Sequence, residues 1–250
     1  MSGHNKWSSI KHKKGAADAK RGKMFTRIIK EIIVAARQGG GDVNGNARLR
    51  SAVQLAKDAN MPKANIENAI KKGTGELPGV TIEECVYEGY GPGGSAVIVE
   101  VATDNRNRTT AELRHMFQRH GGALGEVGSV SWMFNRKGNV ILENPTVDEE
   151  TVFNAVLDAG AEDVSTDGDI IEIYCAVADM EKVKASLTAA NIPYSTAKMT
   201  MVPQNTVQLD ASKARQMLEL MDDLENHDDV QNTYSNFDIS EEIMEKLASS

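Results

Sequence analysis

Apolar residues in the first third of the chain recur with the 3.6-residue period of a helix. The positions that define three successive apolar faces are Phe25, Ile28, Ile29, Ile32, Ile33 and Ala36, then Leu49, Ala52, Val53 and Ala56, then Ile66, Ala69 and Ile70. Gly39 to Gly41 end the first helix, Pro62 suits the first turn of the third, and Gly73 is predicted to follow its last residue. Residues 21–76 are therefore predicted to form a helical domain, and residues 1–20, which lack any period, a flexible basic arm.

From Thr81 the period of the apolar residues changes to two, which is typical of β-strands. Strands are predicted at residues 84–90, 95–103 and 129–134. The last two flank a predicted helix with an apolar stripe from Leu113 to Phe117, and Thr109 and Glu112 at its start have the spacing of a capping box. The predicted order in this region is strand, strand, helix, strand.

Residues 138–202 contain every element of a further unit. The predicted elements are strand 139–143, helix 148–159, a hairpin through Asp167 and Gly168, helix 180–190 and strand 197–202. This β-α-β-β-α-β order is the ferredoxin-like plan. An amphipathic helix around Ala214 to Leu224 and a strand near residues 230–237 then follow.

We therefore predict an α+β fold of three domains. An amino-terminal three-helix domain precedes two ferredoxin-like α/β domains, the third inserted in the second. The predicted bounds are 1–20 for the arm, 21–76 for the helical domain, 77–136 with 204–250 for the discontinuous second domain, and 137–203 for the inserted domain.

Charge divides the chain into two unequal parts. Residues 1–75 hold sixteen Lys and Arg against five Asp and Glu, a net charge of +11, whereas residues 76–250 hold twelve against thirty-one, a net charge of −19. The whole chain of 250 residues carries a formal net charge of −8. This asymmetry predicts a basic end that faces nucleic acid and an acidic body that stays soluble.

The basic end also holds an aromatic residue, Trp7, which could stack on an unpaired base. The cations proposed to bind phosphate around it are Lys6, Lys11, Lys13, Lys14, Lys20, Arg21, Lys23 and Arg27. The alternative is a tail that charge merely keeps soluble. We favour binding, because a solubilising tail has no need of an aromatic residue among its cations.

Two further motifs are candidate contacts for nucleic acid. Residues 89–94, GYGPGG, match the letters of a dinucleotide-binding loop, but a predicted strand follows them, so a tight hairpin is favoured. Its tip residues, Tyr90, Gly91, Pro92, Gly93 and Gly94, form a loop suited to contact. Residues 105–110, NRNRTT, sit at a predicted helix start, where Arg106 and Arg108 could hold an anion or form surface salt bridges; the two alternatives weigh evenly.

Several classes of protein are disfavoured. Cys85 and Cys175 lack the spacing of a disulfide framework or a zinc site, and none of the five histidines has metal-ligand spacing. No P-loop, nucleophile elbow or kinase motif is present, so we expect no enzyme, no cofactor, no metal and no small-molecule substrate. The longest apolar stretch, residues 28–36, contains Lys30 and Glu31, so neither a membrane segment nor a secretion signal is predicted, and a cytoplasmic location fits best.

Long strings of residues resemble the YebC family over nearly the whole chain. They are GHNKWSSIKHKKGAADAKRGK at Gly3–Lys23, GGGD at Gly39–Asp42, NMPKANIENAI at Asn60–Ile70, YEGYGPGG at Tyr87–Gly94, DNRNRT at Asp104–Thr109 and GSVSWMF at Gly128–Phe134. The resemblance implies three domains arranged around a cleft, in a cytoplasmic protein usually described as a DNA-binding transcriptional regulator. Mitochondrial relatives look like translational activators, and bacterial members have been linked to ribosomes slowed at proline runs.

On that resemblance, residues 6–23 would form the nucleic-acid arm. Residues 90–94, with Arg106 and Arg108, would be contacts to RNA or the ribosome. The family has no established set of catalytic residues to carry over.

Three functions are therefore open. The first is a DNA-binding transcriptional regulator, although no convincing helix-turn-helix or base-reading helix face is evident. The second is an RNA-binding translation factor on the ribosome, which uses the segregated charge better because the acidic domains stay away from phosphate. The third, a small-molecule sensor, rests on fold analogy alone. The physical argument favours RNA, whereas the resemblance favours transcription.

Overall fold

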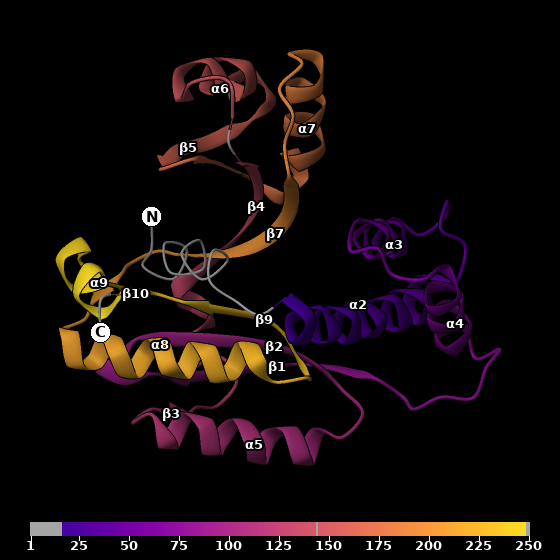
Figure 1. Cartoon of the computed structure of the whole chain (residues 1–250), viewed down its shortest axis with the longest axis horizontal. Coiled ribbons are helices and arrows are strands. Elements are labelled where there is room, and N and C mark those ends of the chain that lie inside the picture. The colour runs from indigo at the N-terminus through magenta and orange to yellow at the C-terminus, as the bar shows by residue number, and fades with distance from the viewer. Residues whose placement is uncertain (1–16, 144, 249–250) are drawn as a thin grey trace.

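The computed structural model describes residues 17–143 and 145–248, which form helices and several β-sheets (Figure 1). Helices α2 (Ala17–Gly39), α3 (Ala47–Asp58) and α4 (Lys63–Thr74) come first. Helix α2 begins inside the segment predicted as an arm, because this segment is rich in alanine, the strongest helix former. The rest of the predicted arm, residues 1–16, lies outside the described residues.

The three helices pack around one apolar cluster that includes Ile32, Leu49 and Ala56, all fully buried. Asn46 joins the end of α2 to the start of α3. Its side chain accepts a hydrogen bond from Leu49 N, which caps α3, and donates to Ala35 O at 2.8 Å. Three helices are thus present where helices were predicted, and a buried cap fixes the turn between the first two of them.

The end of α4 differs from the prediction. The helix continues past Gly73 to Thr74, and Gly75 caps it with a φ of 82°, the left-handed conformation that glycine adopts most easily. Gly73 instead serves the packing of α4 on α2, because a Cβ atom there would lie 2.6 Å from Ile33 O. Sequence alone did not distinguish the glycine of a helix cap from the glycine of a close helix contact.

The first sheet has the strand order β3-β1-β2-β9 and is antiparallel throughout. Its elements are β1 (Glu83–Tyr90), β2 (Ala96–Thr103), α5 (Arg106–Arg119), β3 (Ala123–Leu124), α8 (Ala211–Asn226) and β9 (Val230–Ser235). Helices α5 and α8 lie on one face of this sheet (Figure 1), where Val97, Val99 and Val101 of β2 pack against them. The other face of β2, with Ala96 and Ile98, is buried too, so both faces of this strand lie in a core.

The connectivity of this first sheet is not the ferredoxin-like order that was predicted for it. A ferredoxin-like sheet begins with a strand-helix-strand unit, whereas here the hairpin β1–β2 comes first and α5 then leads to β3 on the far side of β1. The first sheet shares with the ferredoxin-like plan only its four antiparallel strands and the two helices on one face. Its two central strands, β1 and β2, are joined directly by a hairpin.

The strand predicted at residues 129–134 does not exist. The chain forms a 3-10 turn, η2 (Ser131–Met133), and the edge strand is the short β3 instead. The buried carboxylate of Glu88 accepts hydrogen bonds from the backbone N–H groups of Gly128, Val130 and Ser131. Those donors would have served strand pairing, so the side chain of Glu88 replaces a neighbouring strand as their partner.

The second sheet follows the ferredoxin-like plan as predicted, with the strand order β5-β6-β4-β7. Its elements are β4 (Phe134–Glu143), α6 (Glu149–Val156), η3 (Leu157–Ala159), β5 (Ala161–Asp167), β6 (Ile170–Cys175), η4 (Val177–Asp179), α7 (Met180–Ala189) and β7 (Thr196–Pro203). Helices α6 and α7 cover one face, where Val140, Val152 and Ile173 are fully buried. Phe134 and Met201, from β4 and β7, pack with Ile98 of the first sheet and join the two sheets.

Short elements complete the carboxyl-terminal part of the chain. They are β8 (Val207–Gln208), β10 (Phe237–Asp238) and α9 (Glu241–Ala248). Strands β8 and β10 pair in parallel. The elements β8, α8 and β9 follow the whole second sheet in sequence, and β9 belongs to the first sheet. The second sheet is therefore formed by a segment that lies, in sequence, between two parts of the first (Figure 1).

Replacing Gly73 by alanine is expected to lower the free energy of unfolding by about 1–3 kcal/mol, because the added methyl group would overlap the backbone of α2. Gly22→Ala, within α2, is the matched control. No atom lies within 4 Å of the added methyl there, so the usual helix preference for alanine should raise stability by up to about 1 kcal/mol. Chemical denaturation of both variants measures the two free energies of unfolding. A change in the same direction in both variants would contradict the prediction.

Candidate nucleic-acid interface

Three cations on one side of α2 bind the carboxyl-terminal end of α8. Lys23 Nζ donates to Asn226 O at 3.1 Å, Arg27 donates to Glu225 O, and Lys30 Nζ donates to Asp228 O at 2.9 Å. The last carbonyl groups of a helix carry partial negative charge and lack partners within the helix. Lys23 and Arg27 therefore supply both hydrogen bonds and countercharge to this end of α8, and Lys30 binds the turn that follows it.

The predicted phosphate-binding residues of the basic end consequently separate into groups. Lys6, Trp7, Lys11, Lys13 and Lys14 lie outside the described residues. Lys20 and Arg21 belong to the first turns of α2. Lys23 and Arg27 are the two for which the structure gives contacts, and those contacts are with protein. The binding role of all these residues stays a prediction.

Asp229, three residues after the end of α8, is the most heavily bonded acidic side chain of this region. Its carboxylate accepts from Lys30 Nζ at 2.5 Å, Arg108 Nη2 at 2.9 Å, Thr109 Oγ1 at 2.7 Å and Thr103 Oγ1 at 3.0 Å. Its side chain is 4% exposed. Burial by itself raises the pKa of Asp229, but the hydrogen bonds from Lys30, Thr109 and Arg108 outweigh burial and hold the pKa well below its ordinary value.

The start of α5 explains why Thr109 is not a helix cap. Asn105 caps this helix, because its Oδ1 accepts from Arg108 N at 3.1 Å. Thr109, predicted as the cap, lies inside the helix, is fully buried and faces Asp229. Arg108 is also bonded to Asp104 at 2.8 Å, so one of the two predicted anion-binding arginines is held between two carboxylates of the protein. The side chain of Arg106, in the first turn of α5, is exposed.

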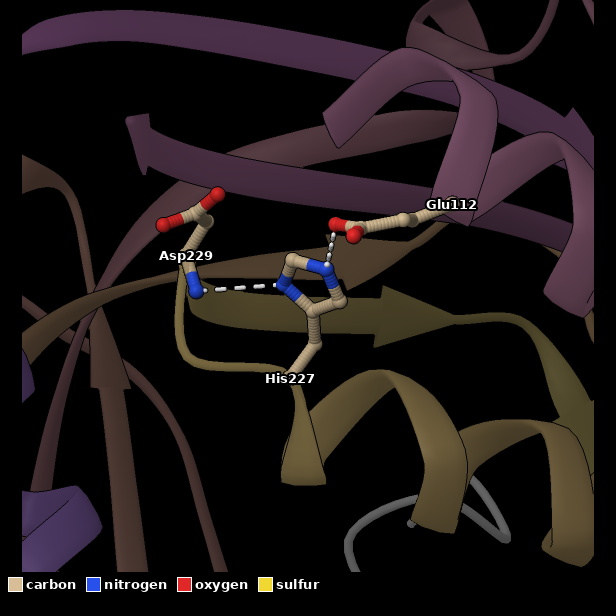
Figure 2. Close-up of side chains that lie close together, drawn as sticks. All are labelled: Glu112, His227 and Asp229. Atoms are coloured by element: carbon tan, nitrogen blue, oxygen red, sulfur yellow. Dashed lines mark hydrogen bonds and ion pairs between the residues drawn. The ribbon is translucent and has the colours of Figure 1, made fainter. Parts of the chain in front are cut away.

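His227 extends this network to α5 (Figure 2). Glu112, His227 and Asp229 bring ligand-type atoms within 4.8 Å of one another, which is close enough to hold a metal ion. The ring nitrogens are already engaged, however: Asp229 N donates to Nδ1 at 3.1 Å, which leaves Nε2 to donate to Glu112 at 2.8 Å. Two cations, Lys30 and Arg108, also occupy the carboxylate of Asp229. The arrangement fits a hydrogen-bonded network better than a metal site.

The hairpin tip predicted as a contact lies at the far end of the sheet from the arginines. Tyr90 pairs with Ala96 at the start of β2, and Arg106 follows the end of β2. A strand of eight residues separates its ends by roughly 23 Å. The tip of the hairpin is Gly91 followed by the turn η1 (Pro92–Gly94), with φ of 72° at Gly93 and 77° at Gly94. The fold therefore places the two candidate contacts apart, not in one site.

Five exposed cations lie on α3 and α4, outside the candidate residues of the basic end. They are Arg50, Lys57, Lys63, Lys71 and Lys72. Lys57 lies in the last turn of α3, and Lys71 and Lys72 in the last turn of α4. Within residues 17–143 and 145–248, no carboxylate pairs with these three lysines. The signal in the sequence was their place on the polar side of each helix, opposite the apolar stripe.

The fold and these exposed cations define a class of protein: a basic helical domain carried by two antiparallel α/β sheets. Comparison with known proteins agrees. The family model described as the TACO1/YebC protein N-terminal domain matches residues 5–76, and the model described as the TACO1/YebC second and third domain matches residues 82–237. The chain belongs to the TACO1/YebC family, as its sequence motifs predicted.

Full-length relatives are similar to this chain. A probable transcriptional regulatory protein of Geobacter sulfurreducens is 59% identical over 247 residues, which cover 99% of this chain and 100% of the relative. A protein of the same description from Syntrophobacter fumaroxidans is 57% identical over 249 residues, with the same coverage. The crystal structure of a conserved hypothetical protein from Aquifex aeolicus, 47% identical, superposes with a TM-score of 0.84 over 92% of this chain and 95% of that one.

None of the described helices is both long enough and apolar enough to cross a membrane. The longest of them, α2, is interrupted by charged residues along its length.

Replacing Asp229 by asparagine is expected to lower the free energy of unfolding at neutral pH by about 3 kcal/mol, because Lys30 and Arg108 lose their buried countercharge. Asp228→Asn is the matched control, since it removes the same charge from an exposed side chain. Because folding lowers the pKa of Asp229, its contribution is complete above the ordinary carboxyl pKa of about 3.9 and is lost as the pH falls below that value. Denaturation from pH 7 to pH 3 should show the difference between Asp229→Asn and wild type shrinking. A constant difference would contradict the ionic account.

Proposed function

We propose that this protein is a non-enzymatic regulator of gene expression that binds nucleic acid through its basic amino-terminal part. The observation that carries the proposal is the separation of charge, with a net +11 in residues 1–75 and −19 in the remainder. The phosphates of a nucleic acid would be drawn to the basic end first, which sets the orientation of binding. The description of the relatives as transcriptional regulatory proteins supports the same class of function.

The structure suggests which cations are available to phosphate. Lys57, Lys71 and Lys72 are exposed on the helical domain, and no described carboxylate pairs with them. Lys23, Arg27 and Lys30, in contrast, are bonded to the end of α8, and their release would break that contact. We therefore assign the first contacts with phosphate to the exposed lysines and to the predicted arm that includes Lys11, Lys13 and Lys14.

Two targets follow from this proposal. Duplex DNA is the target that the description of the relatives suggests, and RNA, including ribosomal RNA, is the alternative that the physical argument favours. RNA is favoured because loose binding to phosphate needs no helix that reads base edges, and because acidic sheets of this size would limit approach along a duplex. A role in relieving stalled ribosomes belongs to this alternative.

Changing Lys57, Lys71 and Lys72 together to glutamine is expected to weaken nucleic-acid binding and to reduce the dependence of log affinity on log salt by about 0.7–0.9 for each lost phosphate contact. Fluorescence anisotropy with labelled RNA and DNA at several salt concentrations measures the slope. The matched control changes Lys182, Lys184 and Lys198, which lie in the second sheet and its helix α7. An unchanged slope in the first variant, or an equal loss in both, would contradict the proposed surface.

Sedimentation through a sucrose gradient at near-physiological salt separates the two targets. Migration of the endogenous protein with ribosomal particles, abolished by RNase, is expected if the target is ribosomal RNA. A protein that stays at the top of the gradient, while crosslinking in cells recovers specific duplex DNA, would establish the transcriptional alternative. Near-physiological salt is required, because low salt strengthens every phosphate contact.

A further inference from the structure

Two exposed aromatic side chains are fixed side by side at the hairpin end of the first sheet. Tyr90 Oη donates to Ser129 O at 3.0 Å, and Trp132 Nε1 donates to the same oxygen at 3.1 Å. The two donor atoms therefore lie within about 6 Å of each other. Trp132 is 66% exposed and Tyr90 38% exposed, and Val127, two residues before Ser129, is 85% exposed.

Residues 128–131, next to Trp132, are held by hydrogen bonds to a buried side chain. The carboxylate of Glu88, which is 4% exposed, accepts three backbone hydrogen bonds of 2.7–2.8 Å from Gly128, Val130 and Ser131. Burial raises the pKa of Glu88, but these backbone hydrogen bonds outweigh burial and lower it, so the carboxylate stays charged at neutral pH. Gln204 Nε2 also donates to Trp132 O at 3.0 Å. The rings are thus positioned before any ligand arrives.

The chemistry of the pair limits what it can bind. The phenol O–H and the indole N–H both donate to Ser129 O, so neither donor is free and the exposed ring surface is the main part left for a partner. A ring face binds another flat π-system by stacking. Two rings cover the area of one or two bases, far less than the roughly 800 Å² that each partner buries in a standard protein interface.

We propose that Tyr90 and Trp132 form a stacking platform for an unpaired base of single-stranded nucleic acid. The inference rests on the proposed function and makes it more specific. Bases inside a duplex hide their faces in the helical stack, whereas single strands and loops expose them. Phosphate would hold the strand at the basic helical domain, and the platform would hold a base at the opposite end of the first sheet.

Fluorescence of Trp132 tests the platform directly. The chain has two tryptophans, so Trp7→Phe leaves Trp132 as the single reporter. A short single-stranded RNA of mixed sequence is expected to quench its emission at near-physiological salt, and a duplex of the same length is not. In the chain that keeps Trp7, Trp132→Ala should weaken single-strand binding about tenfold, and Trp132→Phe should retain most of the affinity.

Phe153→Ala is the matched control, because Phe153 is also an exposed aromatic residue, on α6 of the second sheet. Its affinity for single-stranded RNA should equal that of the wild type. Unchanged melting temperatures show that each variant is folded, as expected for side chains on the surface.

The outcomes distinguish the platform from the function on which it rests. One outcome is that anisotropy detects RNA binding while Trp132 emission and the affinity of Trp132→Ala stay unchanged. That outcome would overturn the platform alone, and the rings would then be assigned to a protein partner. Equal quenching by duplex and single strand would overturn base stacking. Absence of binding to every RNA and DNA, in the wild type as in the lysine variants, would overturn the proposed function together with the platform.

Discussion

The buried carboxylate of Asp229 is the interaction on which the arrangement of the amino-terminal part depends. It joins Lys30 of α2, Thr103 at the end of β2, and Arg108 and Thr109 of α5 at one point, three residues after the end of α8. A buried carboxylate is stable only when cations and hydrogen-bond donors surround it, so each of these elements must be in place together. Lys23 and Arg27 reinforce the contact by binding the last carbonyls of α8. The same small region therefore sets how the basic helices sit on the acidic sheets.

This contact gives the cations of the basic end two different physical roles. Lys23, Arg27 and Lys30 offset the partial charge of a helix terminus and a buried carboxylate, at short range and with partial burial. Lys57, Lys71 and Lys72 point into solvent, where their charges act over roughly a Debye length of 10 Å and respond strongly to salt. The net charge of residues 1–75 counts the cations of both groups alike and does not show this difference. The first group holds the domains together, and the second is the one that a polyanion meets first.

Glu88 shows a related use of a carboxylate at the other end of the first sheet. Its three backbone donors would have formed a strand, and the side chain captures them to make a turn that carries Trp132. The exposed aromatic pair is therefore a consequence of a buried polar side chain and not of apolar packing. Asp229 and Glu88 are thus both buried carboxylates that hold neighbouring segments in place through hydrogen bonds. The two buried carboxylates lie near opposite ends of β2: Asp229 binds Thr103, and Glu88 holds the turn next to Tyr90.

Local pattern determined the helices α2, α3 and α4, the hairpin β1–β2 and the whole second sheet, because apolar periods of 3.6 and 2 and the turn at Asp167 and Gly168 are properties of short segments. The sequence also determined the family, through its long motifs. Only the tertiary structure decided that Gly73 serves packing and not capping, that residues 131–133 form a turn, and that Arg108 and Arg27 bind protein groups. Each of these depends on an atom far away in the chain: Ile33 O, the Glu88 carboxylate, Asp229 or the end of α8. Pairing between distant residues leaves no periodic signal in one sequence, so the arrangement of the candidate sites had to come from the fold.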